Sequence, residues 1–131
     1  ERDYGLPFNP GPLGQNSRDA LIVEQYAIAQ GVGLAFHDAV MKAYWQRGEN
    51  IESHDVLQAL ALSVGLGADA VRQALENPQY VQAVDDDHAQ ALAYGLGGVP
   101  ATVLAERYLI SGAQPYAVFE ETVQKLLAQC L

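Results

Sequence analysis

The residues best suited to chemistry fall in three places along this 131-residue chain. His37 and Asp38 are adjacent, the run from Asp85 to His88 is rich in metal-binding side chains, and Cys130 is the one thiol. A histidine beside a carboxylate can act as a general base, and carboxylates with an imidazole can hold a divalent cation. A thiolate can act as a nucleophile or in disulfide exchange.

The acidic run does not have the geometry of a metal site. Its spacing places it on a helix, where successive side chains point about 100° apart. Asp85 and His88 could share a face, but two protein ligands rarely suffice for zinc. We therefore expect a solvated acidic helix face and no bound metal.

The remaining histidines and aromatic residues fit structural roles. No motif places a Ser or Cys nucleophile where His37 could activate it, so we interpret His37 as a surface or boundary residue. His54 falls in a predicted first helical turn and is expected at the surface. Phe36 and the pair Tyr44-Trp45 have helical spacing and are expected in the core.

Cys130 lies next to the C-terminal residue, at the negatively charged end of a predicted helix, which is an unfavourable place for a thiolate. We interpret it as incidental and expect no catalytic residue in this chain. A single cysteine excludes an internal disulfide and a cysteine zinc site. Together with the absence of an apolar segment in the opening residues, it favours a cytoplasmic protein.

Composition narrows the classes of partner. The net charge is −9, from 16 acidic and 7 basic residues, which argues against binding to nucleic-acid phosphates. Half of the residues are hydrophobic, which is enough for a folded core, and no apolar run approaches the roughly 18 residues of a membrane span. The glycines near residue 97 precede a strand and not a helix, so they do not form a phosphate loop, and no cofactor is expected.

The chain is predicted to have three parts. Residues 1–15 contain three prolines and three glycines and read as an extended connector. Residues 16–96 carry a succession of amphipathic patterns separated by glycines, which predicts a helical bundle that opens at Asn16-Ser17. Residues 97–131 predict two short strands and a closing helix that packs through Phe119, Val123, Leu126 and Leu127. The fold class is therefore mainly α with a small β-hairpin.

The segment from Gly97 to Pro115 is unusual because Pro100 stands directly before an apolar strand. Proline donates no hydrogen bond, so it belongs at the first residue of a strand or on an edge. The strands are expected at 101–105 and 107–111, with a tight turn at Glu106-Arg107. The first strand is apolar on both faces, which is typical of a strand covered on both sides.

This order of elements resembles the C-terminal part of DsbA-like thioredoxin-superfamily proteins, in particular the FrnE-like branch of dithiol–disulfide isomerases. The likeness extends over nearly the whole chain, and its most specific elements are the loop and the turn that flank the hairpin. The matching residues are Gly98, Val99, Pro100 and Thr102, then Ser111, Gly112, Ala113, Gln114 and Pro115, with Asn16-Ser17, Phe36-His37-Asp38-Ala39 and Ala43-Tyr44 in the helical part.

The resemblance implies a helical domain inserted into a thioredoxin fold, followed by the β-β-α half of that fold. In the family the proline follows a cis peptide bond and faces the active-site cysteines. Gly98, Val99 and Pro100 are therefore the expected substrate-binding residues, and proteins with thiols or disulfides are the expected partners. An extended substrate can pair with such a loop as an added strand.

The family's Cys-x-x-Cys segment has no counterpart in these residues, so the chain is expected to be a fragment or truncated form that is inactive alone. One alternative is a relative of 2-hydroxychromene-2-carboxylate isomerase, which shares the fold and uses bound glutathione. Another is a non-catalytic interaction module. Without its neighbouring strand, the strand at 101–105 would leave an open edge. A homo-oligomer is therefore expected, formed either by pairing of strand edges or by exchange of residues 1–15.

Overall fold

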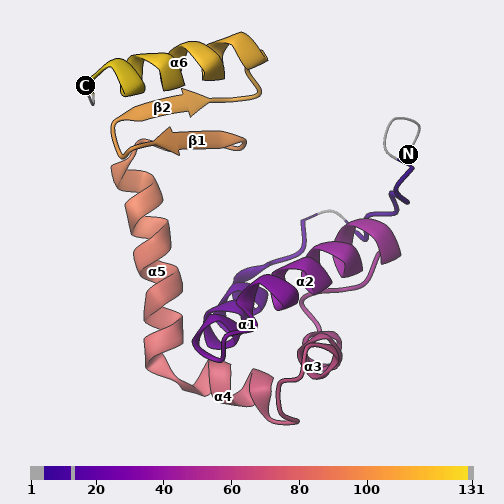
Figure 1. Ribbon diagram of the computed structural model, residues 1–131. Coiled ribbons are helices and arrows are strands. Elements are labelled where there is room, and N and C mark those ends of the chain that lie inside the picture. Colours follow the sequence, from indigo (N-terminus) through magenta and orange to yellow (C-terminus); the bar gives the residue numbers. More distant parts are fainter. Residues whose placement is uncertain (1–4, 13, 130–131) are drawn as a thin grey trace. The chain divides into compact units, whose positions relative to one another are not determined.

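The computed structural model describes residues 5–12 and 14–129. Within them, six helices and one two-stranded sheet follow one another (Figure 1). The helices are α1 (Arg18–Ala29), α2 (Gly33–Arg47), α3 (His54–Ser63), α4 (Ala70–Glu76), α5 (Pro78–Ala93) and α6 (Tyr116–Gln129). The strands are β1 (Ala101–Leu104) and β2 (Tyr108–Ser111). The predicted fold class, mainly α with a β-hairpin, is confirmed.

The chain divides into two compact units, Glu1–Asp86 and Asp87–Leu131, with the division falling inside α5. Unit 1 holds α1 to α4 and the start of α5. Unit 2 holds the end of α5, the hairpin and α6. Within the described residues, no helix is long and apolar enough to cross a membrane.

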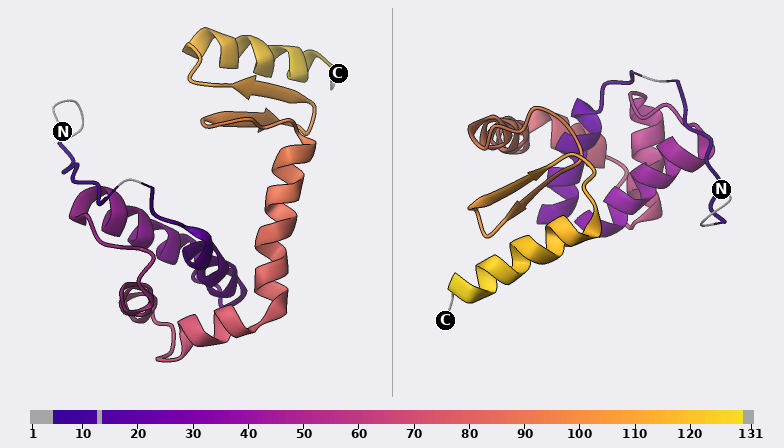
Figure 2. Two further views of the ribbon diagram at one scale, coloured as in Figure 1. Left: turned by 180° about the vertical axis from the view of Figure 1, so that it is seen from behind. Right: turned by 90° about the horizontal axis from the view of Figure 1, so that it is seen from above.

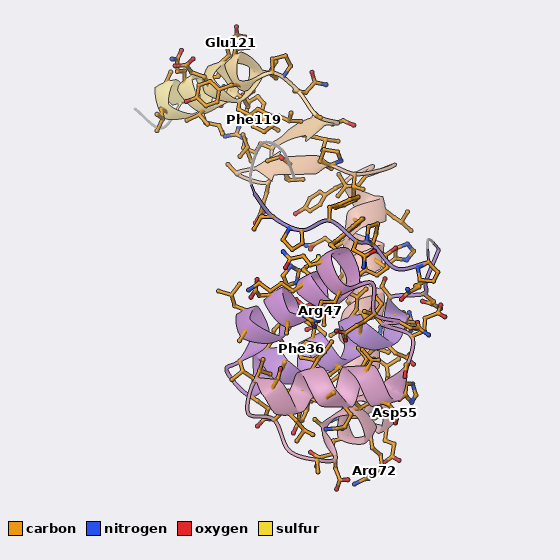
Figure 3. All side chains as sticks on the ribbon, turned by 90° about the vertical axis from the view of Figure 1, so that its right-hand side faces the viewer. Phe36, Arg47, Asp55, Arg72, Phe119 and Glu121 are labelled. Carbon is orange, nitrogen blue, oxygen red and sulfur yellow. The ribbon has the colours of Figure 1, made fainter. Side chains whose placement is uncertain are left out.

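The core of unit 1 forms where the helices meet. Phe36, Leu57 and Val23 have no exposed surface, and Phe36 lies among the helices in Figure 3. Burial of a side chain of this size stabilises the fold by roughly 1.5–3 kcal/mol. Alanines also belong to this core, among them Ala27, which is fully buried. The prediction placed Phe36 correctly, but Trp45 is 41% exposed, so its assignment to the core is wrong.

Three of the described helices end in the same way. Gly31, Gly65 and Gly95 adopt positive φ angles of 79°, 89° and 70° after α1, α3 and α5. The N–H of the residue after each glycine then donates to a carbonyl five residues earlier, as in Leu66 to Ala61 at 3.0 Å. This geometry satisfies carbonyls that a helix end leaves free, and glycine adopts it without strain.

The end of α2 is completed by the N-terminal connector. The N–H of Asn9 donates to the carbonyl of Trp45 at 2.8 Å, and that of Gly11 donates to Tyr44 at 3.2 Å. Both carbonyls belong to the last turn of α2 and would otherwise have no backbone partner. The rings of Phe8 and Trp45 stack, with centroids 5.8 Å apart. The described part of the connector therefore has a defined role as the cap of α2.

The sheet is a single antiparallel pair in which Ala101 faces Ser111 and Leu104 faces Tyr108. β1 ends one residue earlier than predicted, because Ala105 joins the turn. Ala105 and Glu106 have φ angles of 51° and 54°, and the N–H of Arg107 donates to the carbonyl of Leu104 at 3.1 Å. A turn with two positive φ angles matches the twist of a hairpin.

Helix α6 follows the hairpin (Figure 2). The amide Nε2 of Gln129 donates to the hydroxyl of Tyr108 at 2.8 Å and joins α6 to β2. Of the residues expected to pack inward, Phe119 and Leu126 are half-buried, whereas Val123 and Leu127 remain 43% and 62% exposed. The apolar stripe of α6 is thus only partly covered by the hairpin.

Candidate functional site

The segment before β1 carries backbone polar groups that are left without partners among the described residues. Gly97, Gly98 and Val99 make no backbone hydrogen bond to any described residue. Their side-chain positions are equally open, because the side chain of Val99 is 95% exposed and nothing lies within 4 Å of a Cβ built on either glycine. The Val99–Pro100 peptide bond is cis.

The loop is nevertheless held in place at its end. The N–H of Gly112 donates to the carbonyl of Pro100 at 2.8 Å. This bond extends the strand pairing by one residue beyond the facing residues Ala101 and Ser111. Gln114 stabilises the turn that follows β2, because its Nε2 donates to the carbonyl of Ser111 at 2.9 Å. The two sequence elements that flank the hairpin therefore meet. Exposed, unpaired N–H and C=O groups beside a fixed strand can pair with an extended polypeptide.

The acidic run behaves as a helix surface. Asp85 forms an ion pair of 2.7 Å with Arg18, and Asp86 accepts a hydrogen bond from Gln82 at 2.9 Å. The pKa of Arg18 is raised, chiefly by its hydrogen bond to Asp85. Among the residues that the structure describes, no group of three His, Cys, Asp or Glu side chains could hold a metal ion. These contacts give Asp85 and Asp86 the roles of ordinary helix-surface carboxylates.

His37 and His54 are both paired with carboxylates. Nδ1 of His37 lies 3.0 Å from Oε1 of Glu24, and Nε2 of His54 lies 2.8 Å from Oδ2 of Asp19. Asp38, the sequence neighbour of His37, pairs instead with Lys42 at 2.6 Å. The His37-Asp38 sequence pair is therefore not a side-chain pair, and Glu24 was not recognisable as the partner because it lies on another helix. Cys130 lies outside the described residues.

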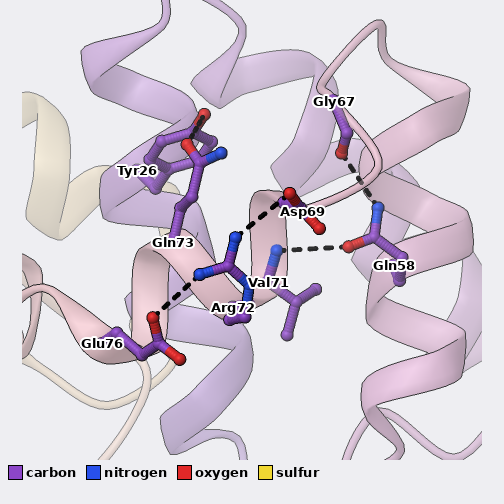
Figure 4. Close-up of polar contacts among 8 residues, drawn as sticks. All are labelled: Tyr26, Gln58, Gly67, Asp69, Val71, Arg72, Gln73 and Glu76. Carbon is purple, nitrogen blue, oxygen red and sulfur yellow. Dashed lines mark hydrogen bonds and ion pairs between the residues drawn. The ribbon is translucent and has the colours of Figure 1, made fainter.

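A polar cluster around Arg72 is structural (Figure 4). Its guanidinium pairs with Asp69 at 3.1 Å and Glu76 at 3.0 Å, and these bonds raise the pKa of Arg72. Gln58 of α3 accepts from the N–H of Val71 at 3.3 Å and so caps the first turn of α4. The bond from Val71 to Gln58 joins α4 to α3. Because the charged groups of the cluster are paired with one another, the cluster offers no reactive group.

The chain resembles known proteins both in sequence and in fold. The chain belongs to the family of DSBA-like thioredoxin domains, whose model matches residues 1–124. It is similar to a solved "probable DsbA oxidoreductase" from Streptomyces coelicolor, with 30% identity and a TM-score of 0.73. It shares the fold of a 2-hydroxychromene-2-carboxylate isomerase at 22% identity and a TM-score of 0.77. No curated protein shows significant sequence similarity to the chain.

The chain spans only part of the length of these solved structures. The alignment with the Streptomyces protein covers 86% of this chain and 49% of that one. The alignment with the isomerase covers 98% of this chain and 62% of that one. Membership of the DsbA-like thioredoxin family and the mainly helical fold with a β-hairpin are confirmed, whereas the FrnE-like branch stays a prediction.

Proposed function

We propose that the chain forms part of a FrnE-like, DsbA-type thiol–disulfide oxidoreductase and contributes its substrate-binding loop. In this proposal Gly98, Val99 and Pro100 bind the backbone of an extended polypeptide that carries a thiol or disulfide. The observation that supports it most directly is the row of unpaired backbone groups at residues 97–99, fixed to the hairpin through Gly112 and Pro100. Membership of the DSBA-like thioredoxin family supports this reaction class.

Disulfide chemistry explains why this chain would bind the substrate while a Cys-x-x-Cys segment would carry out the reaction. In exchange, a thiolate attacks one sulfur of a disulfide and the other sulfur leaves as a thiolate, through a mixed disulfide. A dithiol cycle needs two cysteines, and these 131 residues contain one. The residues described here would therefore orient the substrate backbone, while the reacting pair would be that of a Cys-x-x-Cys segment of the family type. Pro100 offers no N–H and no reactive side chain that would compete for a thiolate.

Backbone binding can be tested in the chain itself. An unfolded, disulfide-containing polypeptide such as scrambled ribonuclease should shift the amide resonances of residues 97–102 of ¹⁵N-labelled protein. Gly98→Pro removes one N–H from the loop and should weaken this binding several-fold. Val99→Ala keeps every backbone group and should leave the affinity within about twofold. Equal affinities for the two variants, or shifts confined to other residues, would contradict the proposal.

Catalysis can be tested separately. The chain alone should not turn over in an insulin-reduction assay, and Cys130→Ser should change nothing. Turnover that disappears in Cys130→Ser would assign this cysteine a catalytic role and contradict the proposed division of labour.

A second candidate is a glutathione-dependent isomerase, favoured by the structural match to 2-hydroxychromene-2-carboxylate isomerase over 98% of the chain. Titration with reduced glutathione separates the two candidates. Saturable shifts at residues 97–100 with glutathione, and none with the unfolded polypeptide, would favour the isomerase.

We also propose that the chain associates with itself through β1. In the described residues β1 pairs with β2 alone, so its other edge presents free N–H and C=O groups. Such an edge is a template for another strand. Sedimentation over a wide range of protein concentration should reveal a dimer or larger species. A monomer at every concentration would contradict this part of the proposal.

A further inference from the structure

A second feature of interest lies in unit 1, apart from the loop at residues 97–100. A cavity of about 310 Å³ is formed between α1, α2 and the segments that adjoin them. Its volume lies at the lower end of the range for sites that bind small organic molecules, roughly 300–1,000 Å³. Most of its wall is apolar, formed by Ala20, Leu21, Val40, Met41, Trp45 and Ile51.

Three large apolar residues of this wall are partly exposed to solvent. Leu21 and Met41 are each 44% exposed and Trp45 is 41% exposed, although all three belong to well-formed helices. Their burial would be favourable by about 25 cal/mol for each Å² removed from water. Exposed apolar side chains grouped around a cavity are typical of binding sites.

Two polar side chains of this wall, those of His37 and Glu24, contact each other. Nδ1 of His37 lies 3.0 Å from Oε1 of Glu24, and both side chains line the cavity. A carboxylate only accepts hydrogen bonds, so Nδ1 must carry the proton. In the neutral ring Nε2 then has a free lone pair, and it has no hydrogen-bond partner among the described residues. In this neutral tautomer His37 presents Nε2 as an acceptor, and the bond from Nδ1 to Glu24 fixes its orientation.

The charge of the wall restricts what could bind. Glu24 contributes a carboxylate, and no lysine or arginine of the described residues lines the cavity. The chain as a whole carries a net charge of −9. An anionic ligand would be repelled, whereas a neutral hydroxyl group can donate a hydrogen bond to Nε2 of His37.

We propose that this cavity binds a small neutral molecule with a mainly apolar body and one hydroxyl group, which donates to Nε2 of His37. The apolar walls take the body, and the Glu24–His37 pair selects the hydroxyl. The site does not depend on the proposed function of residues 97–100, since all of its residues lie in unit 1.

Ligand binding in the cavity can be followed at Trp45, because it lines the cavity and is the one tryptophan of the chain. In ¹⁵N-labelled protein its indole N–H gives a single resonance. We expect 4-butylphenol to shift this resonance saturably. 4-Butylanisole has the same apolar body but no donor, so it should bind roughly 3- to 10-fold more weakly, the contribution of one hydrogen bond.

Two matched variants test the role of His37. His37→Phe keeps a ring but removes the acceptor, so the affinity for the phenol should fall to that for the anisole. His54 is also paired with a carboxylate, Asp19, but does not line the cavity. His54→Phe should therefore leave both affinities unchanged. If His37→Phe does not fold, the ¹⁵N resonance of His37 Nε2 in the unaltered protein provides the same test, since the phenol should shift it and the anisole should not.

Three results would overturn the proposal. The first is no saturable shift of the Trp45 resonance with either compound. The second is equal affinity for the phenol and the anisole in the unaltered protein. The third is a Trp45 resonance that moves with protein concentration in the absence of any compound, which would mean that a second copy of the chain covers this face.

Discussion

The N–H of Gly112 donates to the carbonyl of Pro100 at 2.8 Å and so links the two ends of the hairpin. The bond lies one step beyond the strand pair Ala101 and Ser111 and fixes the last residue of the candidate loop. It depends on the backbone of Gly112, which has a φ of 76°. A left-handed conformation of this kind costs a residue with a side chain roughly 1–2 kcal/mol.

Gly112→Ala should therefore destabilise the hairpin by about 1–2 kcal/mol. The measurement is amide hydrogen exchange, in which the protected amides of β1 and β2 should exchange roughly 5- to 30-fold faster. Gly97→Ala is the matched control, since nothing lies within 4 Å of its Cβ position and its φ is not in the left-handed region. Unchanged exchange in Gly112→Ala would show that the bond to Pro100 does not hold the loop.

A substitution in the turn of the hairpin should increase the stability of the hairpin. Glu106 has a φ of 54° in a position that favours glycine, so Glu106→Gly should stabilise the hairpin by about 1 kcal/mol. Arg107→Gly, at a neighbouring residue without a positive φ, should instead weaken it by increasing the freedom of the unfolded chain. Hydrogen exchange of the β2 amides distinguishes the two. Slower exchange in Arg107→Gly than in Glu106→Gly would place the turn one residue later, as the sequence had suggested.

Local patterns were sufficient to predict the elements. Gly48, Gly65 and Gly95 mark helix ends because each supplies a left-handed backbone, and this preference is local to the residue. The hairpin was placed correctly to within one residue, because β-branched and apolar residues flank a short polar turn. The error at Ala105 arose because alanine gives no sign of a positive φ.

Relations between distant residues could not be predicted. The partner of His37 is Glu24, 13 residues earlier, and it depends on how α1 packs on α2. Trp45 was expected in the core because aromatic residues at helical spacing usually pack there, yet it stacks on Phe8 of the connector. The proline-rich composition of the connector indicated an extended chain but not its contact with α2. Such contacts depend on how distant segments pack together, and the residues near each position in the sequence do not reveal this packing.

Gly48 illustrates a tertiary constraint on a helix end. Its φ is 66°, and a Cβ built there would lie 3.1 Å from the carbonyl oxygen of Asn9. Gly65 also has a positive φ, of 89°, but nothing lies within 4 Å of its Cβ position. Gly65→Ala should cost about 1 kcal/mol from backbone strain, and Gly48→Ala should cost more because it also displaces the connector. Chemical denaturation measures both, and equal losses would contradict a close contact with Asn9.

Phe8 should contribute to stability through its contact with Trp45. The two rings are stacked at an interplanar angle of 17°, and the adjacent N–H of Asn9 bonds to the Trp45 carbonyl. Aromatic pairs contribute about 0.5–1.5 kcal/mol beyond their burial, so Phe8→Ala should lower the free energy of unfolding by at least that amount. Trp45 emission should also shift to longer wavelength as the indole gains contact with water. Leu6→Ala, at another exposed apolar residue of the connector, is the control and should leave both quantities nearly unchanged. If Phe8→Ala alters neither the emission nor the stability, the connector does not remain on α2 in solution, and the last carbonyls of that helix must be solvated.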